Sequence, residues 1–290
     1  MRESASMVSY WRGASPSLRL ILITVGTTLA LWFIKVVLNL VGLPTSWLDV
    51  NLALPGSLYS LGLRPWTLFT YMWSHNALGH LVINMLLLYT FGRMFLAYFT
   101  KQQFYALYIL GGMVGGLFYP LFFSALDAMG QFYIHLPLYG SSAAILSLVV
   151  AVGFYRPFDR VRLVWVGRVP YYVIALLFVF CSLLLNLHSN IGGSVAHLGG
   201  GFLGLLFARL LHHRVDMTVP VLHVYRSVRA LFCPSSWVKR PKRTPPPSET
   251  REKQEPIPSD DVEIDEILAK VKRSGYSALT EEERARLFRR

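Results

Sequence analysis

A serine at the start of an apolar helix is the side chain of this sequence best suited to covalent chemistry. The stretch YGSSAAILSLVVAVGFY, residues 139–155, sets a glycine and two serines before a hydrophobic run. A hydroxyl becomes a strong nucleophile when a neighbouring base accepts its proton, and a neutral histidine can be that base. We therefore interpret Ser142 as a candidate nucleophile.

Two histidines lie at the depth of this serine if each segment is helical. Ser142, His80 and His197 precede an arginine near the end of their own apolar segment by 14, 13 and 12 residues. At the rise of an α-helix these lengths are about 21, 20 and 18 Å. His197 is then placed to act as the general base. Since no Asp or Glu lies in the apolar segments near that depth, we predict a Ser-His dyad.

The negative oxygen of a tetrahedral intermediate needs hydrogen-bond donors. The backbone N–H of Ser142, at a helix N-terminus, is one candidate donor. His80 and Asn84 stand one turn apart on one helix face, and their side chains are the other candidates. Taken singly, Ser142 would more often be a packing serine, and the His80–Asn84 pair an interhelical polar clamp. Their common depth favours chemistry.

Three glycines are interpreted as packing positions at this site. Gly200 and Gly204 are one turn apart on the segment of His197, and small residues let membrane helices approach closely. They are expected to bring that segment against the segment of Ser142. Gly140 belongs to a non-helical approach to the serine, which is tolerated at membrane depth only beside protein or a water-filled cavity.

The composition is that of a membrane protein. Of the 290 residues, 53% are hydrophobic and only 15% are charged, which is outside the range of soluble domains. The first apolar run is too long for a cleaved signal peptide. We predict an all-α, polytopic bundle of six transmembrane helices, over residues 20–40, 77–97, 104–123, 142–155, 171–187 and 195–211.

The distribution of charge sets the orientation of this bundle. The net charge is +12, but Lys and Arg gather in alternate connections and in the C-terminal tail. By the positive-inside rule, both termini are cytosolic, and the partner of the chain is the lipid bilayer, with no role for nucleic acid. Cys181 and Cys233 have no disulfide or metal-ligand spacing, and Cys233 is a candidate for acylation. No metal and no cofactor is expected.

Four regions are predicted along the chain. Residues 1–19 form a cytosolic N-terminal segment, 20–212 the membrane domain, 213–259 a basic Pro-rich linker, and 260–290 a small cytosolic helical hairpin. Within the hairpin, Thr280 and Glu283 have the spacing of a capping box. A hairpin of this size is expected to need a partner surface, so the tail is predicted to bind a cytosolic partner.

These motifs together resemble those of the rhomboid intramembrane serine proteases. The matching pieces are HNALGHLVINM, GSSA and AHLGG, which carry His80 and Asn84, Ser142, and His197 respectively. The resemblance covers about residues 15–212. It implies Ser142 as nucleophile, His197 as base, and His80 with Asn84 as oxyanion donors. It also implies single-pass membrane proteins as substrates and a bacterial inner membrane as the location.

Three residues depart from the family pattern. Ala143 stands where glycine is usual, Tyr71 where a further histidine is often found, and Leu146 where an aromatic ring commonly supports the histidine. Leu146 keeps open a non-proteolytic rhomboid-like protein that binds membrane helices. A small-solute transporter is a second alternative, but the polar layer lies off-centre and no inverted repeat is visible.

Overall fold

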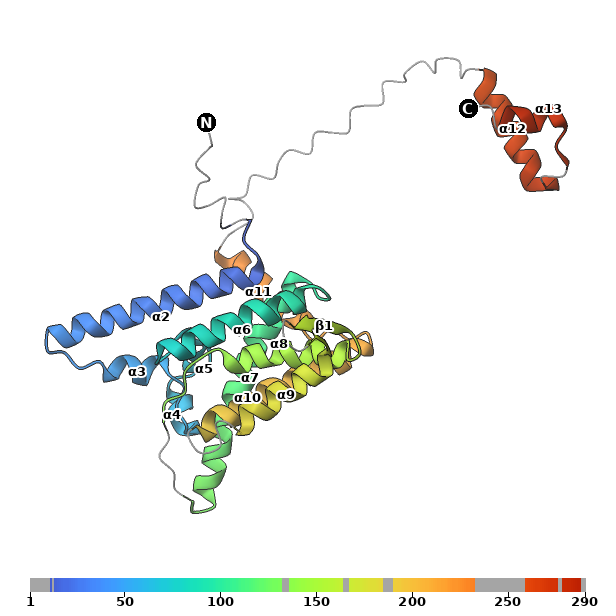
Figure 1. Ribbon diagram of the computed structural model, residues 1–290. Coiled ribbons are helices and arrows are strands. Elements are labelled where there is room, and N and C mark those ends of the chain that lie inside the picture. The colour runs from blue at the N-terminus through green and yellow to red at the C-terminus, as the bar shows by residue number, and fades with distance from the viewer. Residues whose placement is uncertain are drawn as a thin grey trace, which may run out of the picture. The chain divides into compact units, whose positions relative to one another are not determined.

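The computed structural model describes residues 11, 13–131, 136–163, 167–184, 190–232, 259–275 and 278–287. They fall into two compact units, divided between Arg229 and Ala230 (Figure 1). The predicted all-α membrane fold is confirmed, apart from a small β-hairpin. The elements are α2 (Pro16–Leu40), α3 (Ser46–Leu52), α4 (Leu58–Leu63), α5 (Thr67–Thr70), η1 (Tyr71–Trp73), α6 (Leu78–Leu96), α7 (Lys101–Ala128), α8 (Ser142–Tyr155), β1 (Arg160–Leu163), β2 (Gly167–Pro170), α9 (Tyr171–Leu184), α10 (Ile191–His212), α11 (Val219–Phe232), α12 (Ser259–Ser274) and α13 (Glu281–Leu287).

Local sequence signals account for where the long helices begin. Ser15 caps α2, accepting a hydrogen bond from the Leu18 N–H, and Pro16 occupies the first helical position, where its missing N–H costs nothing. Thr100 and Gln103 form a reciprocal capping box at the start of α7. Each signal fixes the first residues of its own helix.

Four helices in the described part of the chain are long and apolar enough to cross a membrane: α2, α6, α7 and α10. The predicted spans at 142–155 and 171–187 correspond to α8 and α9, which are shorter apolar helices. Residues 185–187 lie outside the described residues. The shortness of α8 has a physical reason: it is enclosed by other helices, so its length need not match the lipid.

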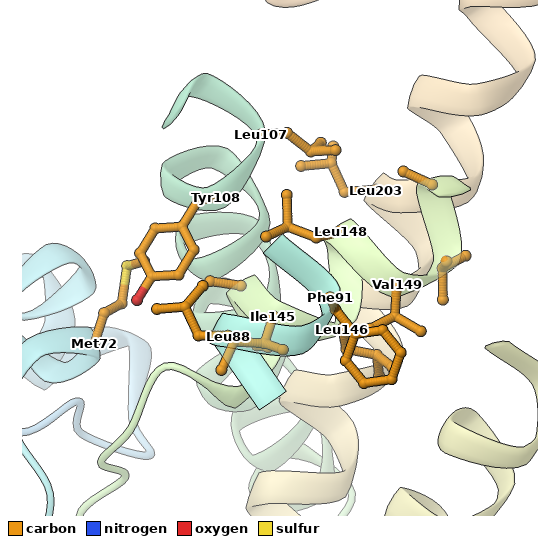
Figure 2. Close-up of a cluster of buried hydrophobic side chains, with 14 of the residues drawn as sticks. Met72, Leu88, Phe91, Leu107, Tyr108, Ile145, Leu146, Leu148, Val149 and Leu203 are labelled. Atoms are coloured by element: carbon orange, nitrogen blue, oxygen red, sulfur yellow. The ribbon is translucent and has the colours of Figure 1, made fainter. Parts of the chain in front are cut away.

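Helix α8 is the centre of the membrane unit. It contacts α6, α7, α9 and α10, while α2 packs along α6 at the side of the unit (Figure 1). Every residue of α8 from Ala143 to Gly153 is buried. Figure 2 shows Ile145 and Leu148 of this helix among apolar side chains that come from α6, α7 and α10. The first residue of α8 is therefore fixed from several sides.

Glycines bring α10 into backbone contact with α8 and bring α7 against the Ala143 side chain. A Cβ atom on Gly200 would lie 2.2 Å from the Ala143 carbonyl oxygen, and one on Gly204 would lie 2.3 Å from the Ser147 carbonyl oxygen. On α7, a Cβ on Gly115 would lie 2.7 Å from the Ala143 Cβ. No side chain fits at these distances, so close approach of the three helices depends on glycine. Gly200 and Gly204, which the sequence indicated as packing positions, are the residues that make the α10 contacts.

The segment predicted as a linker from residue 213 begins with a helix instead. Arg214 adopts a left-handed turn (φ 61°), and Asp216 then accepts hydrogen bonds from the Thr218 N–H (2.8 Å) and from Gln103 Nε2 on α7 (2.8 Å). Helix α11 follows. Its valines, leucines and Phe232 recur at helical spacing, a pattern that the basic and proline-rich composition farther along concealed. The rest of the linker, with Cys233, lies outside the described residues.

Two loops also contain more structure than was predicted. The connection 42–70 holds the short helices α3, α4 and α5, and the loop after α8 folds as the antiparallel pair β1–β2. Helix α10 begins at Ile191, four residues before the predicted start, because Asn190 caps it by accepting a hydrogen bond from the Gly193 N–H (2.9 Å).

The second unit contains α12 and α13. The predicted capping box is confirmed: the Thr280 N–H donates to Glu283 (2.7 Å), and the Glu283 N–H donates to the Thr280 hydroxyl (3.3 Å). Glu283 also accepts from Lys270 of α12 at 2.7 Å. With Ile267 and Leu279 buried, the hairpin has a small apolar centre of its own.

Candidate active site

Ser142 and His197 meet within the membrane unit, at the N-terminal end of α8. The distance between Ser142 Oγ and His197 Nε2 is 2.6 Å, which is a hydrogen bond. Ser142 is the first residue of α8, and His197 lies in the second turn of α10. Since α8 and α10 are in backbone contact through Gly200 and Gly204, the separation of these two side chains is set by the helix packing.

Gly140 holds the two predicted oxyanion donors beside the serine. Its φ of 107° lies in the left-handed region, which favours glycine. A Cβ on Gly140 would lie 2.7 Å from His80 Cε1 and 3.6 Å from Asn84 Nδ2. Glycine is therefore required here both by the backbone conformation and by the approach of the His80 ring. This contact places His80 and Asn84 beside Gly140, which precedes Ser142 by two residues in the chain.

Asn84 presents an unused donor at this place. Its side chain is 2% exposed, and its Nδ2 makes no hydrogen bond to any residue that the structure describes. Leaving a buried N–H unpaired costs about 1–3 kcal/mol. The first N–H groups of α8, including that of Ser142, also have no partner within the helix. A negatively charged oxygen placed between Asn84 Nδ2 and the first N–H groups of α8 would accept hydrogen bonds from both.

His80 is supported from α2 by way of His75. The rings of His75 and His80 meet edge to face with centroids 5.0 Å apart. His75 is buried; its Nδ1 lies 3.4 Å from the Thr28 hydroxyl, and its carbonyl accepts from Trp32 Nε1 at 2.9 Å. The first helix therefore contributes to the orientation of a predicted site residue that it does not touch.

The chain segment before Ser142 is fastened to the connection that follows α2. Asp49 of α3 accepts hydrogen bonds from Tyr139 Oη and from Lys35 Nζ of α2, both at 2.5 Å. Leu138 and Leu54 exchange two backbone hydrogen bonds of 3.0 Å. Sequence reasoning missed Asp49 and Tyr139 as site residues, because only the fold brings residue 49 to residue 139.

Tyr71 fixes the same segment from the other side. Its carbonyl accepts the Gly140 N–H at 3.0 Å, and its hydroxyl donates to the Gly112 carbonyl of α7 at 2.6 Å. Tyr71, which departs from the family pattern, thus has a structural role. With Asp49 and Leu54, it defines the path of the backbone into Ser142.

A cavity of about 510 Å³ opens at the dyad. Among the residues that the structure describes, no Asp or Glu lines it, and no group of three His, Cys, Asp or Glu side chains is arranged to hold a metal ion. Leu146 lines the cavity with an aliphatic side chain. The other wall belongs to α9, with Leu177, Phe178, Cys181 and Ser182. The cavity is apolar with a few polar groups at one end, which suits a peptide with hydrophobic side chains.

A family model described as the Rhomboid domain matches residues 63–214, slightly more than half of the chain. This match contains Ser142, His197, His80 and Asn84. It excludes Asp49, so the fastening of Tyr139 by α3 lies outside the matched region.

Two curated proteins are similar to parts of the chain. "RHOMBOID-like protein 12, mitochondrial" from Arabidopsis thaliana is 31% identical over 144 residues, which is 46% of this chain and 43% of that protein. "Presenilin-associated rhomboid-like protein A, mitochondrial" from Danio rerio is 32% identical over 79 residues, 27% of this chain and 19% of that protein. The matches thus span less than half the length of either relative.

Proposed function

This chain belongs to the rhomboid family, and from that membership we propose that it is a serine endopeptidase that cleaves peptide bonds in or near transmembrane segments. The observation that carries the proposal is the 2.6 Å hydrogen bond between Ser142 Oγ and His197 Nε2. A buried Asn84 with an unpaired donor, at the same cavity, supports it.

The proposed reaction proceeds in two steps. Ser142 Oγ attacks the carbonyl carbon of the scissile bond while its proton passes to His197 Nε2. The oxyanion accepts hydrogen bonds from the Ser142 N–H, Asn84 Nδ2 and His80. The tetrahedral intermediate collapses, and His197 gives its proton to the leaving amine. Water, deprotonated by His197, then hydrolyses the acyl ester and restores the serine. No cofactor is needed.

The apolar lining of the cavity supports membrane proteins as substrates. A peptide bond within a helix is shielded by its own hydrogen bonds, so the substrate has to unwind before Ser142 can reach it. Single-pass membrane proteins with Gly or Pro near the scissile bond are therefore the proposed substrates. In the proposed orientation both termini are cytosolic, and the dyad lies toward the outer face.

The proposed location is the inner membrane of a bacterial cell, as the resemblance of the motifs implies. Both named relatives are mitochondrial, so a mitochondrial membrane is the alternative. Fractionating the source cells and detecting the chain in one of these membranes would decide between them.

The test is cleavage of a panel of single-pass membrane proteins by purified protein, with Ser142→Ala and His197→Ala as variants. Loss of cleavage in both variants, with unchanged thermal unfolding, is the expected result. Ser147→Ala is a matched control: it removes a buried hydroxyl from the same helix, but that hydroxyl bonds the Ala144 carbonyl (2.7 Å) and does not line the cavity. This control should cleave like the natural protein.

Labelling by a serine-directed fluorophosphonate separates a missing substrate from a missing activity. If the panel is not cleaved but the probe labels Ser142, the site is reactive and the panel lacks the substrate. If the probe fails as well, the helix-binding alternative is favoured. The aliphatic Leu146, which cannot stack on the imidazole, is the feature that supports that alternative.

A further inference from the structure

A second cavity lies at the opposite end of α8 from the dyad. It has a volume of about 520 Å³ and lies where the C-terminal ends of α8 and α10 meet the start of α9. We call it the basic groove. Its lining residues are Phe154, Pro157, Phe158, Tyr172, Arg209, His212 and His213. Ligand sites in proteins commonly have volumes of about 300–1,000 Å³, so this groove is large enough for a ligand.

The lining of the groove is divided between basic and aromatic side chains. Arg209, His212 and His213 come from the last turn of α10 and the residue after it. The His212 ring stacks on the Tyr155 ring with centroids 4.9 Å apart. The Arg156 guanidinium lies 5.6 Å from the centre of the Tyr155 ring. One aromatic ring, that of Tyr155, thus contacts His212 and adds Arg156 to the basic groups at this end of the bundle.

The aromatic part of the groove is unusually exposed. Phe158 is 82% exposed, and its ring lies 6.2 Å from that of Tyr172. Water would make such exposure costly, whereas the interfacial region of a bilayer accepts aromatic rings readily. Among the described residues that line the groove, none is acidic. The ligand that complements this surface has an anionic head and an apolar tail.

We propose that the basic groove binds a phospholipid of the surrounding bilayer with an anionic headgroup. The phosphate accepts hydrogen bonds from Arg209, His212 and His213, and an acyl chain lies against Phe158 and Tyr172. Basic pockets between transmembrane helices on the cytoplasmic side are suited to such headgroups, because that leaflet is rich in anionic lipid. The site is about the length of α8 away from Ser142, so its existence does not depend on the proposed protease activity.

The experiment uses the full chain, purified in a maltoside detergent and stripped of lipid. Dioleoyl phosphatidylglycerol or dioleoyl phosphatidylcholine is added, and bound lipid is measured by native mass spectrometry. We expect phosphatidylglycerol to be retained in preference to phosphatidylcholine. Arg209→Gln should weaken phosphatidylglycerol binding about tenfold, as expected for the loss of one charge-assisted hydrogen bond.

Arg93→Gln is the matched control. Arg93 is exposed in the last turn of α6 and bonds the Tyr89 hydroxyl (2.9 Å), at the same end of the bundle but outside the groove. Arg93→Gln removes one positive charge, as Arg209→Gln does, but should leave lipid binding unchanged. Arg209→Lys, which keeps the charge, should retain part of the binding, and a melting curve for each variant checks that it is folded.

Three results would overturn the proposal. Equal losses in Arg93→Gln and Arg209→Gln would mean that general surface charge attracts the lipid. Equal retention of the two lipids would mean that the headgroup is not recognised. Displacement of phosphatidylglycerol by millimolar inorganic phosphate, without any loss of binding in Phe158→Ala, would mean that the groove binds the free anion and not a lipid.

Discussion

Replacing Gly200 by alanine tests whether helix packing sets the geometry of the dyad. The added Cβ would lie 2.2 Å from the Ala143 carbonyl oxygen, whereas ordinary contact begins at 3.4 Å. The obstacle is backbone, which cannot rotate away, so α10 has to move from α8 by about 1 Å, and a misplacement of that size costs about 100-fold in rate. His197 is carried on α10, one turn from Gly200, and moves with it.

The neighbouring glycine provides the matched control. A Cβ on Gly201 would meet the side chains of Val150, at 3.7 Å, and Leu146, at 3.9 Å, and both are ordinary contacts. Alanine is the better helix former by about 1 kcal/mol, so Gly201→Ala should raise the free energy of unfolding by up to that amount. Gly200→Ala receives the same helix benefit but overpacks the interface, which typically costs about 1–3 kcal/mol. Gly201→Ala should therefore raise the free energy of unfolding, whereas Gly200→Ala should lower it.

The assays are thermal unfolding in detergent and the rate at which a fluorophosphonate labels Ser142. Gly200→Ala should melt several degrees below the natural protein and label about 100-fold more slowly. Gly201→Ala should melt no lower and label at the natural rate. If both variants have the same melting temperature and labelling rate, contact between α8 and α10 does not set the Ser142–His197 distance, and the reasoning fails.

Three further predictions concern the oxyanion site, the Asp49 contact and the tail. Asn84→Ala should lower the rate of substrate cleavage about 10²–10³-fold without changing the melting temperature, as loss of one oxyanion donor does elsewhere; an unchanged rate would remove Asn84 from that role. Asp49→Asn should lower kcat about tenfold by weakening its charge-assisted hydrogen bond to Tyr139, and Tyr139→Phe should add little to it in a double-mutant cycle; full additivity of the two losses would contradict the contact. The Lys270 ammonium, and next the Thr280 N–H, lower the pKa of Glu283. The folded hairpin therefore gains stability above the ordinary glutamate pKa and loses it as the pH falls through the lowered value; an NMR titration of Glu283 should show the lowered midpoint, and Lys270→Gln should raise it.

The sequence was sufficient to predict the membrane class and most helices. Long apolar runs leave few other structures for residues 16–40, 78–96 and 191–212. The capping box was predictable because its two partners, Thr280 and Glu283, are only three residues apart in the sequence. The helix α11 was missed because a strongly basic, proline-rich composition follows it and dominated the interpretation of the segment.

The sequence also predicts a common depth for Ser142, His197, His80 and Asn84, since helix rise converts residue counts into height in a membrane. Height alone does not say which sides of the helices face one another. The tertiary structure decided this, through the glycine contacts between α8 and α10 and the left-handed Gly140 that receives the His80 ring.

Only the folded chain could reveal the residues that hold this site in place. Asp49 reaches Tyr139, and Trp32 reaches His75, across separations in the sequence that no periodicity records. The basic groove is likewise assembled from the ends of three helices. Sequence by itself determined which segments are apolar helices and at what height along its helix each polar group stands, because hydrophobicity and helix rise are local. The tertiary structure decided which of those groups touch, because contact depends on how whole helices pack.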